Sequence, residues 1–189
     1  ALLVGLAAPM VGVFLVQRRL SLIGDGMGHV ALAGVAVGVI TNKAPVLTAL
    51  VFAVLAAVGI ELVRARGRTS GDVALAVMFY GGIALGVVVF GLSQSGAPSN
   101  LDSYLFGAIT TTSPTDLVVF AVLAVVVVTV TWALRPRLFA VANDEEYARA
   151  TGMRVTAFNI TIEVLHAVHG VVAMRAVGLC CISARLSVP

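Results

Sequence analysis

One run of the sequence reads SPTDLVVFAVLAVVVVTVTWAL from Ser113 to Leu134. Ser113 suits a helix N-cap and Pro114 suits the first helical position, so we expect a helix to begin here. The 21 residues from Pro114 onward would extend about 31 Å, the thickness of a bilayer's hydrocarbon core. The run is apolar on every side and does not alternate with period 2, so it predicts a spanning helix. We expect this helix to stop before Arg135 and Pro136.

The composition of the whole chain is that of a membrane protein. Of its 189 residues, 60% are hydrophobic and 11% are charged, and the mean hydropathy is +1.07. A soluble domain has about 45–50% apolar and about 25% charged residues. A water-soluble protein of this size would lack the polar side chains to cover so much apolar surface. We therefore predict one all-α domain over residues 1–189, a polytopic bundle of transmembrane helices.

Other apolar stretches predict about seven spanning helices in this chain. We expect them at 1–17, 21–40, 44–63, 73–92 and 114–134, with two more in 155–189 broken near Arg175 and Gly178. Both ends of the chain lie inside apolar runs, so we expect one or more further helices beyond Pro189.

The basic residues predict which ends of these helices face the cytoplasm. If the first helix ends on the cytoplasmic side, Lys43 is the only basic residue in the external loops up to residue 154. The cytoplasmic loops then contain all the arginines of that region, as the positive-inside rule expects. These are Arg18, Arg19, Arg64, Arg66, Arg68, Arg135, Arg137, Arg149 and Arg154.

The connection after Leu134 contains a short polar stretch with helix signals. NDEE fits a capping box, with Asn143 as the cap and Glu146 at the third helical position. Glu145 and Arg149 lie four residues apart, and Gly152 is a natural C-terminal stop. The pattern predicts a helix of about two turns, which is too short to span a bilayer. It is either a solvated connector or a docking element for a cytoplasmic partner.

Asp25 and His29 are polar residues inside the apolar stretch 21–40. A carboxylate at the middle of a membrane costs about 2.5–3.5 kcal/mol on insertion scales, so it needs a reason. Spacing of four residues places both side chains on one helical face, and both can bind a divalent cation. Two copies of the pair in a symmetric dimer would supply four metal ligands. The alternative is a structural hydrogen bond between Asp25 and His29 that tethers helices.

Two glycine pairs in the same stretch predict close helix packing. Gly24 with Gly28 and Gly34 with Gly38 have the GxxxG spacing that lets another helix approach. We therefore expect the face with Asp25 to point into a helix bundle or a cavity.

A second polar group lies in the stretch 155–189. His166 and His169 are three residues apart and share a helical face, and Glu163 lies three residues before His166. One interpretation is that these are polar groups hydrogen-bonded within the bundle. The other is a secondary metal contact.

The chain shows no motif for catalysis. A Walker A loop needs glycines before a lysine and Ser or Thr after it. The one lysine, Lys43, is preceded by Thr41 and Asn42 and followed by Ala44. We therefore expect that this chain is not an enzyme and has no permanently bound cofactor.

Several motifs, in their order along the chain, resemble those of one transporter family. RRLSLIGD at residues 18–25, followed by His29, is similar to the RR-x-S-x-x-GD-x-x-x-H signature of ABC-3 family permeases, which import zinc, manganese or iron. Further similar motifs are SYLFG at 103–107 with SPTDL at 113–117, DEEYA at 144–148 with TGM at 151–153, and VAMRAVG at 172–178 with ISA at 182–184. Together they cover nearly the whole chain.

The resemblance implies a homodimeric permease in the bacterial plasma (inner) membrane. It would work with two cytoplasmic ABC ATPase subunits, which alone bind ATP, and with an extracytoplasmic metal-binding protein. Asp25 and His29 would line the path of Zn, Mn or Fe. Residues 144–151 would form the coupling helix that inserts into the ATPase, and the residues implied in coupling are Asp144, Glu145, Glu146, Tyr147, Arg149 and Gly152.

Two other functions fit the same composition. One is an ABC permease for a metal chelate such as a siderophore or cobalamin, which would need a wide cavity and no Asp25–His29 pair. The other is a non-transport membrane metalloprotein, an enzyme or assembly factor with that pair as its metal site. The absence of a third ligand near Asp25 argues against the latter.

Overall fold

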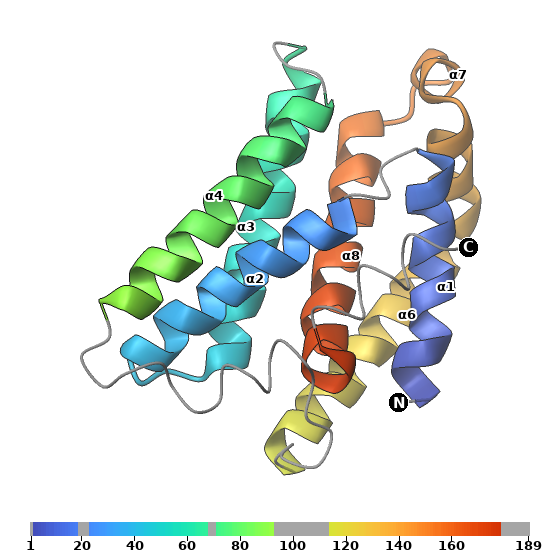
Figure 1. Ribbon diagram of the computed structural model, residues 1–189. Helices are drawn as coiled ribbons and strands as arrows, with labels where there is room; N and C mark the ends of the chain where they lie inside the picture. Colours follow the sequence, from blue (N-terminus) through green and yellow to red (C-terminus); the bar gives the residue numbers. More distant parts are fainter. Residues whose placement is uncertain (1, 19–22, 68–70, 93–113, 179–189) are drawn as a thin grey trace.

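The computed structural model describes residues 2–18, 23–67, 71–92 and 114–178, and every regular element within these ranges is an α-helix (Figure 1). This confirms the predicted all-α class. The predicted N-cap Ser113 and the second helix predicted after Gly178 lie outside the described residues. The helices are α1 (Leu2–Gln17), α2 (Ile23–Ile40), α3 (Pro45–Ala65), α4 (Gly71–Gly91), α6 (Pro114–Asn143), α7 (Glu145–Ala150) and α8 (Val155–Val177).

Helix α6 is longer than the sequence predicted, because it does not stop before Pro136. It contains 30 residues, with Pro136 inside it. Proline removes one backbone hydrogen bond and commonly ends or kinks a helix. Beyond Pro136, however, Leu138 and Val141 are completely buried. Their packing holds the additional turns in helical form, so the prediction that residues 135–143 form a loop is wrong.

Helix α8 lies at the centre of the bundle. It packs against α1, α2, α3 and α6, while α2 packs against α3 and α4 on one side of it (Figure 1). Of the span within α8, 67% is buried inside the structure, compared with 22% for the span within α6. Polar side chains on α8 are therefore shielded from the surroundings of the bundle.

Two glycines of α2 face α3 at close range. A Cβ atom on Gly34 would lie 2.7 Å from the Cα of Ala49 and 2.9 Å from the Cβ of Phe52. A Cβ atom on Gly38 would overlap the hydroxyl of Thr48. The two helices can approach this closely only because these positions have no side chain.

Three helices of the described part are long and apolar enough to cross a bilayer: Pro45–Ala65, Leu117–Asn143 and Val155–Met174. Shorter apolar helices lie at Gly26–Ile40 and Ala76–Gly91. On α3 the small and large side chains point in opposite directions. Alanines 49, 53 and 57 are fully buried, whereas Leu47, Val51 and Leu55 are 53–66% exposed. Small residues inside and large apolar residues outside are typical of helices that pack in lipid.

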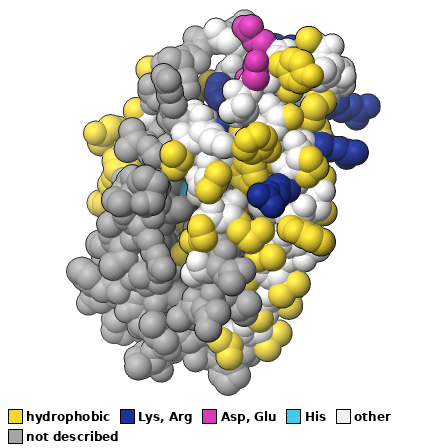
Figure 2. Space-filling model, turned by 90° about the vertical axis from the view of Figure 1, so that its right-hand side faces the viewer, with side chains coloured by type: hydrophobic (Ala, Val, Ile, Leu, Met, Phe, Trp, Pro, Cys, Tyr) yellow, Lys and Arg dark blue, Asp and Glu magenta, His cyan; other side chains and the backbone are white. Residues whose placement is uncertain are grey.

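Charged residues gather at one end of the bundle. On the face shown in Figure 2, the described acidic and basic side chains lie in the upper half, and the described lower part is mainly hydrophobic. Arg18 after α1, Arg64 near the end of α3 and the short helix α7 meet at this end (Figure 1). The connection with Lys43, between α2 and α3, lies at the other end (Figure 1). The arrangement agrees with the predicted sidedness.

Candidate functional site

The N-cap of the short helix α7 lies one residue later than predicted. Asn143 is the last residue of α6, and Asp144 is the N-cap of α7, with extended backbone angles φ −148° and ψ 99°. The backbone N–H of Tyr147 donates to Oδ1 of Asp144 at 2.9 Å. The predicted cap at Asn143 is therefore wrong, because α6 continues through that residue. At the other end Gly152 has φ 81°, the left-handed conformation that favours glycine after a helix.

Helix α7 has an inner and an outer face. Ala148 is completely buried and packs with Val141 of α6 and Val155 of α8. Glu146, Tyr147 and Arg149 are exposed. The hydrophobic contacts of Ala148 hold α7 against the bundle and leave these three side chains exposed.

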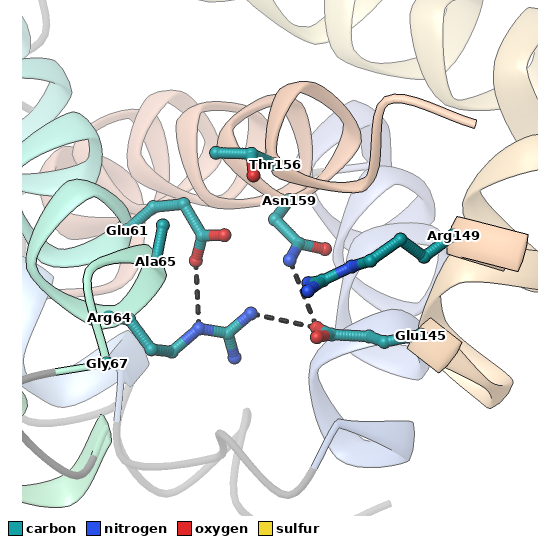
Figure 3. A pocket seen from close by; sticks show the side chains of 8 residues that line it. All are labelled: Glu61, Arg64, Ala65, Gly67, Glu145, Arg149, Thr156 and Asn159. Carbon is teal, nitrogen blue, oxygen red and sulfur yellow. Dashed lines mark hydrogen bonds and ion pairs between the residues drawn. The ribbon is translucent and has the colours of Figure 1, made fainter. Parts of the chain in front are cut away.

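Glu145 points from α7 into the bundle, where three donors converge on one of its oxygen atoms. Oε1 accepts hydrogen bonds from Nη2 of Arg18 at 3.1 Å, Nη2 of Arg64 at 2.9 Å and Nδ2 of Asn159 at 3.0 Å. These donors come from the end of α1, from α3 and from α8. A single carboxylate oxygen thus joins four helices, and Figure 3 shows the contacts with Arg64 and Asn159.

Arg64 extends the group by a further ion pair. Its Nε lies 2.9 Å from Oε2 of Glu61, which is three residues earlier on α3 and only 2% exposed (Figure 3). Glu163 of α8 is equally buried and interacts electrostatically with Arg18. We call Arg18, Glu61, Arg64, Glu145, Asn159 and Glu163 the charged cluster.

The charges of this cluster depend on one another. Burial alone would raise the pKa of Glu145, but Arg64, Arg18 and the hydrogen bond from Asn159 together outweigh it and hold the pKa below its ordinary value. The Arg18 side chain is only 3% exposed. Burial and then the neighbouring charge of Arg64 lower its pKa, while Glu145 counteracts them. An arginine keeps its proton even so, and Arg18 is therefore a buried cation that needs Glu145.

A cleft of about 510 Å³ opens beside the cluster (Figure 3). It lies between the end of α3, α7 and the first turns of α8. Its lining is mostly polar or charged, and consists of Glu61, Arg64, Ala65, Gly67, Glu145, Arg149, Thr156 and Asn159.

Sequence reasoning identified only part of this cluster. It assigned Glu145 to the coupling helix and used Arg18 and Arg64 to orient the chain. Arg18 also belonged to the family signature, but Glu61 and Asn159 were not selected. One signal was available: Glu61 and Arg64 form an i, i+3 ion pair at the end of an otherwise apolar helix. The contacts between helices could not be read from spacing.

The predicted metal pair lies on α2. His29 is partly buried, and its ring packs edge-on against Phe79 of α4, with centroids 4.8 Å apart. The structure does not describe the side chain of Asp25 or the burial of Gly24. Gly28 is buried. The metal-binding role of Asp25 and His29 therefore stays a prediction.

Glu163, His166 and His169 are all buried on α8, at 2%, 0% and 4% exposure. Neither nitrogen of His166 and neither oxygen of Glu163 has a hydrogen-bond partner. Within the described ranges, no three His, Cys, Asp or Glu residues are arranged to hold a metal ion. The secondary metal contact likewise remains a prediction.

Helices long enough to cross a bilayer, buried polar residues on α8 and a short helix at the charged end fit the membrane-embedded subunit of a transporter. The ABC 3 transport family matches residues 1–189, and the chain belongs to that family.

Three known proteins illustrate the similarity. A probable metal transport system membrane protein of Treponema pallidum is 34% identical over 99% of this chain and 70% of its own length. The manganese import system permease protein ScaB of Streptococcus parasanguinis is 31% identical over the whole chain and 67% of its own length. The solved structure of PsaBC from Streptococcus pneumoniae in complex with Fab superimposes with a TM-score of 0.82 at 31% identity, over 98% of this chain and 66% of that one. The chain thus spans about two-thirds of the length of these relatives.

Proposed function

We propose that this chain forms the transmembrane pathway of an ABC importer for divalent metal ions, namely Zn, Mn or Fe. The observation that carries the proposal is the match to the manganese permease ScaB across every residue of this chain. The charged end, with its exposed outer face on α7, supports it by offering a docking point for a cytoplasmic ATPase.

Asp25 and His29 would hold the ion on its way through the membrane. Their spacing on α2 places them on one helical face, and two copies of the chain would supply four ligands. Such a site must bind well enough to admit the ion and weakly enough to release it. Glu163, His166 and His169 would form a second contact along the path.

The energy would come from partner subunits. Two ABC ATPases on the cytoplasmic side would bind ATP and move α7, while an extracytoplasmic metal-binding protein would deliver the ion. Asp144 and Gly152 would fix the ends of α7, and Glu146 and Tyr147 would contact the ATPase from its exposed face. Arg149 would contact the ATPase from the cleft that it lines beside Glu145 (Figure 3). Alternating access between two chains in a bacterial plasma membrane would complete the cycle.

Metal uptake by cells that lack their own importer tests the proposal. Cells that express the permease with its ATPase and binding protein should accumulate one of Zn, Mn or Fe. D25A should abolish most of this uptake, whereas K43A, an exposed residue at the opposite end, should leave it unchanged. Normal uptake by D25A would refute the role of the Asp25–His29 pair. Uptake of a metal chelate in place of the free ion would refute the assigned substrate.

A further inference from the structure

The two glutamates of α7 differ in direction. Glu146 is exposed on the outer face, whereas the Oε1 atom of Glu145 is occupied by three donors from inside the bundle. The Glu145 side chain is 39% exposed, but its Oε1 atom is already engaged by Arg18, Arg64 and Asn159. That atom therefore acts within the permease.

We infer that Glu145 is a positioning residue that transmits the movement of α7 to α2 and α3 through its ion pairs with Arg18 and Arg64. The inference rests on the proposed function and divides α7 into two parts. The outer residues Glu146 and Tyr147 receive the movement from the ATPase, and Glu145 passes it into the membrane.

The geometry of the contacts makes them sensitive to displacement. All three donors bind the same oxygen at 2.9–3.1 Å but come from different helices. When α7 moves, the donors must therefore follow or their hydrogen bonds are lost, because such bonds weaken steeply with distance and angle. Arg18 is held most firmly, since its side chain is 3% exposed and its Nη1 has no other partner. Separation from Glu145 would leave a buried charge uncompensated.

Both arginines lead to the same pair of helices. Arg18 precedes Ile23, the first residue of α2, by five residues and Asp25 by seven. Arg64 lies in the last turn of α3, against which α2 packs closely through Gly34 and Gly38. Arg64 therefore links α7 directly to the α2–α3 pair, which carries the proposed metal ligands, and Arg18 links α7 to the end of α1, close to α2 in the sequence.

A comparison of E145Q with E146Q tests this role. Both changes remove one charge from adjacent residues of α7, but only Glu145 contacts the arginines. The complete permease, assembled with its ATPase in proteoliposomes, would be assayed for ⁵⁴Mn²⁺ uptake and ATP hydrolysis together. E145Q should transport about five- to tenfold fewer ions per ATP hydrolysed while ATP hydrolysis continues. E146Q should lower transport and hydrolysis together, because Glu146 is placed at the contact with the ATPase, and so should keep their ratio.

A double-mutant cycle separates coupling from simple structural support. R64Q should lower the transport ratio as E145Q does, and R64Q combined with E145Q should be little worse than either alone. R64Q and E146Q should combine additively, since these residues do not share a contact. If E145Q does not accumulate in the membrane, R64Q carries the test, because it breaks the same ion pair from the side of Arg64.

The results also distinguish this inference from the proposed function. If the wild-type complex transports no metal ion, the proposed function itself fails. If the wild type transports Mn²⁺ and both E145Q and R64Q keep its ratio of ions to ATP, the inference fails and the proposed function stands. An equal loss of transport and hydrolysis in E145Q would also refute it, since that outcome indicates lost docking of the ATPase.

Discussion

Replacing Gly82 by alanine places a methyl group against α2, whereas the same change at Gly81 places it in open space. A Cβ atom at Gly82 would lie 2.9 Å from Cγ2, 3.0 Å from N and 3.1 Å from Cα of Val30. Nothing lies within 4 Å of a Cβ atom at Gly81. Two of the three atoms that Gly82 would meet belong to the backbone. Helix α4 must therefore move away from α2 to accept the methyl group.

The energetic difference can be worked out because the two glycines are adjacent in one helix. Replacing a helical glycine by alanine favours the helix by about 0.5–1 kcal/mol, and this gain is common to both positions. An overpacked contact costs about 1–3 kcal/mol, and only G82A creates one. For a chain of this length, 1 kcal/mol shifts the melting temperature by about 2–4 °C. G82A should therefore melt about 2–12 °C below G81A.

The assay is thermal unfolding of the purified permease in one detergent, followed by circular dichroism at a fixed heating rate. The fixed rate matters because membrane proteins often unfold irreversibly, which makes the apparent melting temperature depend on the scan. G81A should melt at or slightly above the wild-type temperature. Equal melting temperatures for G81A and G82A would show that α2 and α4 do not approach closely at Val30.

Three further predictions use other parts of the structure. The pKa of Glu145 lies below its ordinary 4.5 in the folded protein, so its ion pairs stabilise the fold above about pH 4.5 and are lost at lower pH. The melting temperature should therefore fall more between about pH 5.5 and 3.5 in the wild type than in E145Q. Because neither nitrogen of the buried His166 has a hydrogen-bond partner, H166L should keep or raise the melting temperature, with a gain in stability of up to about 3 kcal/mol. A drop in metal uptake by H166L would assign His166 to the metal path. L138A, beyond the proline of α6, should cost about 2–5 kcal/mol in the same melting assay; the half-exposed Phe139 is its control, and a similar loss in F139A would argue against a packed extension of α6.

The spanning helices could be predicted from the sequence because apolar runs of sufficient length have few alternatives in lipid. With no water to satisfy the backbone, a run such as Leu117–Leu134 must be helical. The end of α6 could not be predicted in this way. Pro136 is a local signal against helix, and only the burial of Leu138 and Val141 against other helices outweighs it.

The candidate site divides in the same manner. The polar sequence 144–150 predicted the helix α7, although its N-cap is Asp144 and not Asn143. The charged cluster could not be predicted, because Arg18, Arg64, Glu145 and Asn159 are far apart in the chain and meet only when the helices pack. Arginines at helix ends are explained sufficiently by membrane orientation, so nothing in their spacing points to a common carboxylate.

The buried polar residues of α8 restrict how that helix can move. Asn159, Glu163, His166 and His169 follow one another at intervals of three or four residues, so they form a row along one side of the helix. Rotation of α8 about its own axis would turn this row toward acyl chains, at a cost of about 2.5–3.5 kcal/mol for a charged carboxylate alone. Sliding or tilting keeps the row inside protein. Only 22% of the span within helix α6 is buried, compared with 67% for α8, so rotation of α6 would meet less restriction of this kind.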